Sequence, residues 1–192
     1  IETGHDAIFL YLFFALLLLV SCETEREEPP VALQPFQNIH VEVKDMEGRN
    51  LLSNESDAFK DEEIEVRFVK GGKPYFNANM TNNPRGFSVK RTDDSPYLKL
   101  SLSEITKKLS ETDKSSQYET EIFLTLKGNA EKNIKVLYEI NKVSDGGFVT
   151  DSPKTLKVWV DEKLSWQPDT SQPESTEKYQ ARITLKATVP KR

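Results

Sequence analysis

The chain has 192 residues, of which 30% are charged and 36% are hydrophobic, and its formal net charge is -5. This length suits one folded domain with short additional segments. Lysine and arginine are scattered among acidic residues without a basic stripe, which argues against a nucleic-acid partner, because binding to phosphates requires clustered positive charge.

The first predicted element is an uncharged apolar segment near the N-terminus. Residues 7–20 read AIFLYLFFALLLLV. As a helix this segment would span about 21 Å, which is shorter than the roughly 30 Å hydrocarbon core of a bilayer. Such a length is typical of the apolar region of a signal peptide. We therefore expect residues 1–21 to direct export and to be removed.

The end of this segment carries the most specific motif in the chain. Leu19-Val20-Ser21-Cys22 resembles the lipobox of bacterial lipoproteins. The resemblance implies cleavage between Ser21 and Cys22 and attachment of lipid to the Cys22 thiol. Cys22 is the only cysteine, so the chain cannot form an internal disulfide. Two or more acyl chains hold a protein stably at a membrane. The expected partner of this segment is therefore the membrane.

The next segment, residues 22–36, is predicted to be a tether. Residues 23–30 read ETEREEPP, and repelling acids followed by prolines favour an extended chain without a packed core. An acidic cluster just after the lipidated cysteine also resembles the surface-export signal of Bacteroidota lipoproteins. This resemblance implies an outer-membrane protein exposed at the cell surface, with inward-facing anchorage as the alternative.

Residues 37–192 contain several short runs in which apolar and polar residues alternate. Alternation is typical of antiparallel strands with one buried face, and turn sequences such as Gly71-Gly72 separate the runs. The pattern predicts an all-β domain, an antiparallel β-sandwich of immunoglobulin-like or Greek-key type. The apolar positions are Ile39, Val41, Val43; Ile64, Val66, Phe68; Leu98, Leu100, Leu102; Ile122, Leu124, Leu126; Ile134, Val136, Tyr138, Ile140; Leu156, Val158, Val160; and Ala181, Ile183, Leu185, Ala187, Val189.

Two segments depart from this alternation. Ser101 to Glu104 has the spacing of a capping box, and Leu102, Ile105 and Leu109 follow a helical period. We therefore predict one short crossover helix from Ser103 to Ser110. Residues 168–178 are rich in Ser, Thr, Pro, Gln and Glu and are predicted to form an exposed, mobile loop.

The chain is poor in groups for catalysis. His40 is the only histidine beyond the predicted signal peptide, and its place on the polar side of a strand predicts a solvated surface residue. Asp45, Glu47 and Asn50 faintly resemble a calcium loop but are better interpreted as a polar turn. We predict no catalytic residues, no metal site and no cofactor, so the domain is not expected to be an enzyme. The adjacent acids Glu62-Glu63 and Asp93-Asp94 keep a carboxylate-based hydrolase as an alternative.

Three aromatic residues are candidates for ligand binding. Trp159 is out of phase with the apolar positions of its strand, Trp166 lies just beyond it, and Tyr75 follows the Gly71-Gly72 turn. Exposed aromatic rings stack on sugars or anchor a protein partner, although a neighbouring loop could equally cover them. The sequence as a whole resembles uncharacterised β-sandwich lipoproteins of Bacteroidota. We expect a lipid-anchored envelope protein with a non-enzymatic structural or adhesive domain, and the alternative is a glycan- or peptide-binding module of an outer-membrane uptake system.

Overall fold

A computed structural model describes residues 38–75, 85–91, 95–102, 105–141 and 153–190 of the chain. The chain divides into two units, residues 1–33 and 34–192, and every described residue belongs to the second. The predicted signal peptide, Cys22 and the tether thus lie outside the described residues. Within the described residues, no helix is long and apolar enough to cross a membrane.

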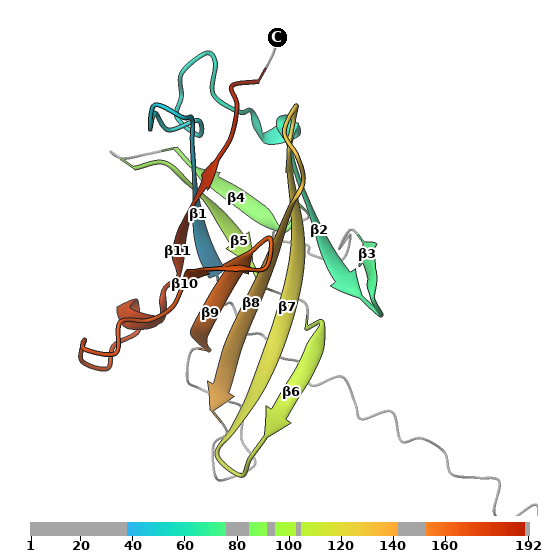
Figure 1. Ribbon diagram of the computed structural model, residues 1–192, viewed down its shortest axis with the longest axis vertical. Coiled ribbons are helices and arrows are strands. Elements are labelled where there is room, and N and C mark those ends of the chain that lie inside the picture. Colours follow the sequence, from blue (N-terminus) through green and yellow to red (C-terminus); the bar gives the residue numbers. More distant parts are fainter. Residues whose placement is uncertain (1–37, 76–84, 92–94, 103–104, 142–152, 191–192) are drawn as a thin grey trace, which may run out of the picture. The chain divides into compact units, whose positions relative to one another are not determined.

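The first of two sheets has four strands in the order β11–β1–β5–β4 (Figure 1). β1 pairs with β11 in parallel, whereas the β1–β5 and β5–β4 pairs are antiparallel. β1 is therefore an internal strand with a neighbour on each side. Its parallel neighbour, β11, comes from the other end of the described chain. The bounds are Asn38–Lys44 for β1, Phe87–Lys90 for β4, Tyr97–Ser101 for β5 and Arg182–Lys186 for β11.

The second sheet has seven strands in the order β10–β9–β8–β7–β2–β3, and β6 pairs with β7 beside this series. All its pairs are antiparallel. Two 3-10 turns, η1 and η2, complete the described elements. The bounds are Ile64–Lys70 for β2, Lys73–Tyr75 for β3, Lys107–Glu111 for β6, Ser115–Leu126 for β7, Lys132–Asn141 for β8, Lys154–Val160 for β9, Lys163–Trp166 for β10, Asp61–Glu63 for η1 and Glu177–Tyr179 for η2.

The core lies between the two sheets and confirms the predicted all-β sandwich. The alternating apolar side chains of β1, β5, β2, β7 and β8 are buried, as period-two alternation requires. The strand around Val158 is also confirmed, but a bulge opposite Leu137 and Tyr138 changes which of its residues face the core. Thr155 and Val158 are therefore the buried residues of β9, whereas Leu156 and Val160 are half-buried.

The predicted helix from Ser103 to Ser110 is wrong. Residues 107–111 form β6, in which Lys107 lies opposite Glu119 of β7. The amide of Thr106 donates to the Glu119 carbonyl at 2.9 Å, so backbone pairing begins before the strand itself. Leu109, a key position of the predicted helical face, is 43% exposed. The backbone of this segment forms its hydrogen bonds with the long β7 strand and not within the helix that the local spacing of apolar residues predicts. Residues 103–104 lie outside the described residues.

Candidate functional site

A cavity of about 620 Å³ lies on the outward side of the four-stranded sheet. Asn38 and His40 of β1 and Tyr97 and Lys99 of β5 border it on one side. The segment from Glu174 to Gln180, which contains η2, borders it on another, together with Asn141, Pro153 and Lys154 near the ends of β8 and β9. Among the lining residues, only Pro153 has no polar side-chain atom, so the cavity is suited to a polar ligand.

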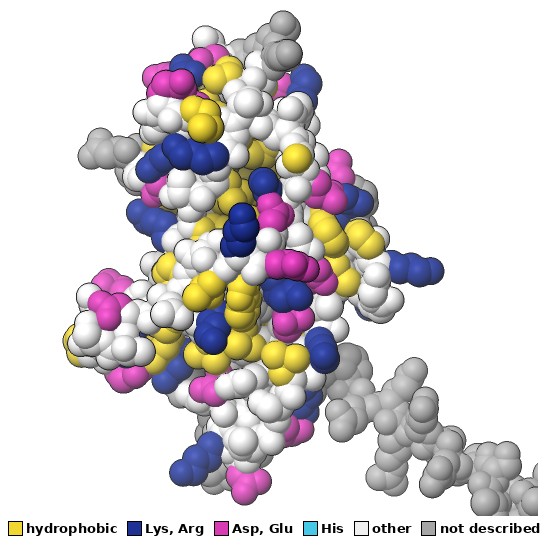
Figure 2. All heavy atoms as spheres, in the orientation of Figure 1, with side chains coloured by type: hydrophobic (Ala, Val, Ile, Leu, Met, Phe, Trp, Pro, Cys, Tyr) yellow, Lys and Arg dark blue, Asp and Glu magenta, His cyan; other side chains and the backbone are white. Residues whose placement is uncertain are grey.

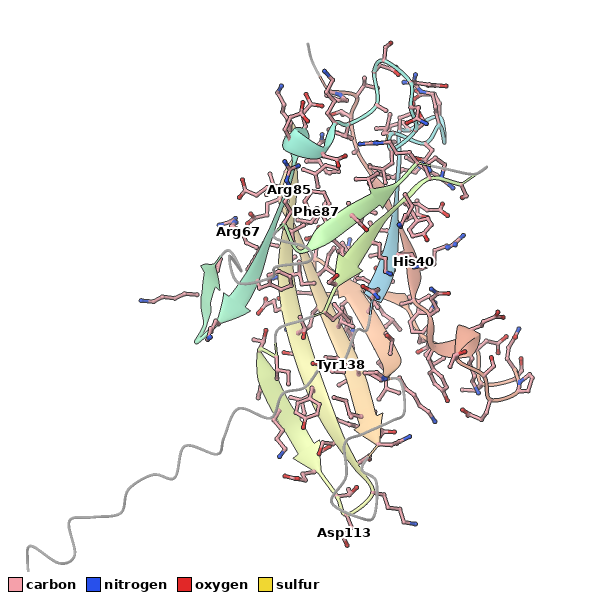
Figure 3. The ribbon with its side chains drawn as sticks, turned by 180° about the vertical axis from the view of Figure 1, so that it is seen from behind. His40, Arg67, Arg85, Phe87, Asp113 and Tyr138 are labelled. Atoms are coloured by element: carbon pink, nitrogen blue, oxygen red, sulfur yellow. The ribbon has the colours of Figure 1, made fainter. Side chains whose placement is uncertain are left out.

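His40 is not the solvated surface residue that alternation predicts. Its side chain points outward from β1, yet it is only 6% exposed. Its ring lies 4.2 Å from the Tyr97 ring, centre to centre, and its Nε2 lies 3.1 Å from the side-chain nitrogen of Gln180. Figure 3 shows His40 on β1 beside β11. The outward face of β1 is therefore covered, by residues from β5 and from the segment before β11.

The surroundings of His40 favour the neutral imidazole. His40 lies opposite Lys99 on β5 and opposite Arg182 on β11. Burial lowers the pKa of His40 from its ordinary value, and the positive charges of Arg182 and Lys99 lower it further. The Nδ1 atom of the ring is buried and has no hydrogen-bond partner among the residues that the structure describes.

Glu174 organises the segment that closes the cavity. It accepts a hydrogen bond from the Tyr179 hydroxyl at 2.7 Å, and this bond is the main reason that the pKa of Glu174 is lowered. Its carboxylate also lies 3.3 Å from Lys178 Nζ and 3.6 Å from Lys154 Nζ. The Lys154 contact connects the segment to β9. The residues predicted as an exposed, mobile loop are indeed largely exposed, but these contacts hold their second half over the cavity.

Stability should fall as the pH falls below about 6.5, and the variant His40→Gln should lack this loss. Above pH 6.5 His40 is neutral in both states, whereas below it the unfolded chain takes up a proton that the folded chain, with its lowered pKa, does not yet bind. Urea denaturation between about pH 5 and 7.5, above the range of ordinary carboxyl titration, measures the effect. If the free energy of unfolding changes equally with pH in the original protein and in His40→Gln, the buried, neutral state of His40 is contradicted.

The aromatic residues predicted to bind ligand do not border this cavity. Trp159 lies opposite Leu164 and Lys135 on the outer face of the seven-stranded sheet. Trp166 lies opposite the buried Val158, so the two tryptophans belong to opposite faces of the sheet. Both are half-buried. The backbone of Tyr75 pairs with Phe68, and its side chain lies outside the described residues.

The outer face that carries Trp159 is a mixed surface. Leu164, opposite Trp159, is 51% exposed, and hydrophobic side chains on this face are interleaved with lysine, arginine and acidic residues (Figure 2). Sequence alternation thus placed Trp159 on the correct face, but Trp166 belongs to the opposite face, so the two tryptophans do not share an aromatic platform. The cavity residues Tyr97, Lys99 and Gln180 were missed, because nothing in the local sequence shows that these three segments meet.

Two of the acidic residues singled out in the sequence, Asp45 and Glu63, have structural partners. The Asp45 carboxylate accepts hydrogen bonds from the backbone nitrogen of Arg49 at 2.8 Å and from its side chain at 3.0 Å, which is the polar turn that the sequence favoured. Glu63 lies in η1 and pairs with Lys127 at 3.1 Å. Asp93 and Asp94 lie outside the described residues. Across the described segments, no group of three His, Cys, Asp or Glu residues is arranged to hold a metal ion.

Comparisons of the chain with protein-family models, with curated proteins and with solved structures found no match. The chemistry of the cavity is therefore the guide to its role. Its lining offers amides, hydroxyls, ammonium groups, two carboxylates, an imidazole and two phenol rings, which together suit a ligand rich in hydroxyl groups.

Proposed function

We propose that this protein is a non-enzymatic binding module of the bacterial cell envelope that takes a polar ligand, most simply a glycan, into the cavity beside His40. The cavity is the observation that carries the proposal: its volume of about 620 Å³ falls within the range of small-molecule sites. A cavity in this size range favours ligand binding over a purely structural role. The lipid anchor on Cys22 and the position at the outer membrane are part of the proposal and rest on the lipobox resemblance.

The ionisation of Glu174 argues against this residue as the general acid of a hydrolase. A glycoside hydrolase needs one carboxyl group that stays protonated near neutral pH to act as the general acid. The pKa of Glu174 is instead lowered, chiefly by the Tyr179 hydrogen bond, so this group stays ionised. His40 is neutral, and its Nε2 already faces the Gln180 amide.

The proposal is tested by blocking the cavity. The chain as isolated from cells, in detergent, is titrated calorimetrically with neutral and acidic oligosaccharides and with short peptides. Thr176 is exposed and borders the cavity, so Thr176→Trp should weaken binding of any ligand found by at least about tenfold, or about 1.4 kcal/mol. Thr170→Trp is the matched control, because Thr170 is an exposed threonine of the same segment that does not line the cavity.

Other outcomes would contradict the proposal. If no oligosaccharide binds, the glycan assignment is wrong. If Trp159→Ala abolishes binding while Thr176→Trp has no effect, the ligand binds on the outer face of the seven-stranded sheet. Hydrolysis of a panel member that disappears when one carboxylate is changed to the amide would show that the protein is an enzyme.

A further inference from the structure

Three side chains form a row across the outward face of the four-stranded sheet. Lys99 of β5 and Arg182 of β11 each lie directly opposite His40 of β1 in their strand pairs. Residues that lie opposite each other share a face, with Cβ atoms roughly 5 Å apart. His40 therefore lies between two cationic residues, at the end of the cavity that the sheet forms.

The positive charge of this row is only partly compensated. Arg182 lies 3.6 Å from Glu42, but the Glu42 carboxylate is also paired with Lys44 at 2.8 Å. Lys99, which borders the cavity, has no ion pair among the described residues. The acidic residues of the lining, Glu174 and Glu177, belong to the opposite, η2 side, where Glu174 is already paired with Lys154 and Lys178. The sheet end of the cavity is consequently cationic.

His40 lies in this row as a buried ring. The side-chain nitrogen of Gln180 lies 3.1 Å from its Nε2, within hydrogen-bond distance. Nδ1 is buried and has no hydrogen-bond partner among the described residues, so the ring forms a covered part of the cavity wall. The positive charge of Lys99, which borders the cavity, favours an anionic oxygen beside it.

We propose that the ligand of this cavity is an acidic saccharide, whose carboxylate or sulfate group binds at Lys99 beside His40 while its hydroxyl groups face the η2 segment. This inference rests on the proposed function and specifies the class of ligand. A saccharide suits this lining, because its amide, hydroxyl and charged side chains can form hydrogen bonds with sugar hydroxyl groups. The phenol rings of Tyr97 and Tyr179 add the aromatic contacts that sugar rings accept.

The test compares ligands that differ in their acidic groups and protein variants that differ in one charge. Trigalacturonate, its methyl ester and a sulfated galactose trimer are titrated into the detergent-solubilised chain by calorimetry. The acid should bind at least about tenfold more tightly than its ester, as expected for hydrogen bonds to a charged group, and its affinity should fall with added salt. Lys99→Gln should remove this preference. Lys90→Gln is the matched control, because Lys90 shares the outward face but does not line the cavity.

The outcomes separate this inference from the proposed function. The carboxylate and sulfate arms show which acidic group the site takes. If the ester binds as tightly as the acid and Thr176→Trp blocks both, the cavity binds glycans but the acidic preference is refuted. If neither form binds, both proposals fail. If only a peptide with a free C-terminal carboxylate binds in a Lys99-dependent way, the saccharide assignment is overturned.

Discussion

Gly86→Ala is expected to destabilise the domain by about 2–4 kcal/mol, well beyond the effect of the same change at Gly128. Both glycines have a positive φ, +73° and +78°, so an alanine at either position costs about 1–2 kcal/mol of backbone strain. At Gly86 a Cβ atom would also lie 2.7 Å from Cε2 of Phe68, whereas at Gly128 no atom lies within 4 Å. The difference in destabilisation between the two variants therefore measures the cost of the close packing of Gly86 on β2. Overpacking of this kind costs about 1–3 kcal/mol.

Phe68 cannot move aside easily, because its side chain is only 1% exposed within the core. Urea denaturation of Gly86→Ala and Gly128→Ala measures the two losses. Combining Gly86→Ala with Phe68→Leu should recover part of the loss, since contacting residues couple in a double-mutant cycle. Equal destabilisation at the two glycines, or simple additivity with Phe68→Leu, would show that the two segments pack less closely than described.

Cys22→Ala is expected to abolish lipidation, the largest effect on the protein in the cell. The lipobox resemblance implies that the Cys22 thiol accepts the lipid before cleavage, so the variant should remain an unacylated, larger precursor. Labelling with a palmitate analogue and a shift in mass measure the effect. Ser21→Ala is the control, because it keeps a small residue before the cleavage site and should be processed normally. A Cys22→Ala protein that still matures and takes up the label would disprove lipidation at this residue.

The sandwich could be predicted from the sequence because its signal is local. In β1, Ile39, Val41 and Val43 are fully buried, and each is separated by one residue, so the inward face can be read directly from the alternation. The prediction for residues 107–111 was wrong for the opposite reason. Its five exposed residues carry no burial pattern, and its conformation is set by pairing with β7, which no local spacing records.

The candidate site could not be predicted because it depends on contacts between distant segments. His40 and Gln180 are 140 positions apart, and alternation says only that His40 points away from the core. Whether an outward-pointing side chain meets water or another segment is decided by the path of that segment. The polar composition of residues 168–178 predicted exposure correctly, but it did not show that Glu174 would be held by Tyr179, Lys154 and Lys178.

The parallel pairing of β1 with β11 constrains the order in which the domain can assemble. β1 ends at Lys44 and β11 begins at Arg182, so the ribosome makes the two neighbours at opposite ends of the described chain. The four-stranded sheet cannot close until nearly all of the domain has been synthesised, and such non-local pairing makes folding slow. A chain with this topology stays open for longer, which would suit the proposed export, because an exported chain crosses its channel before it folds.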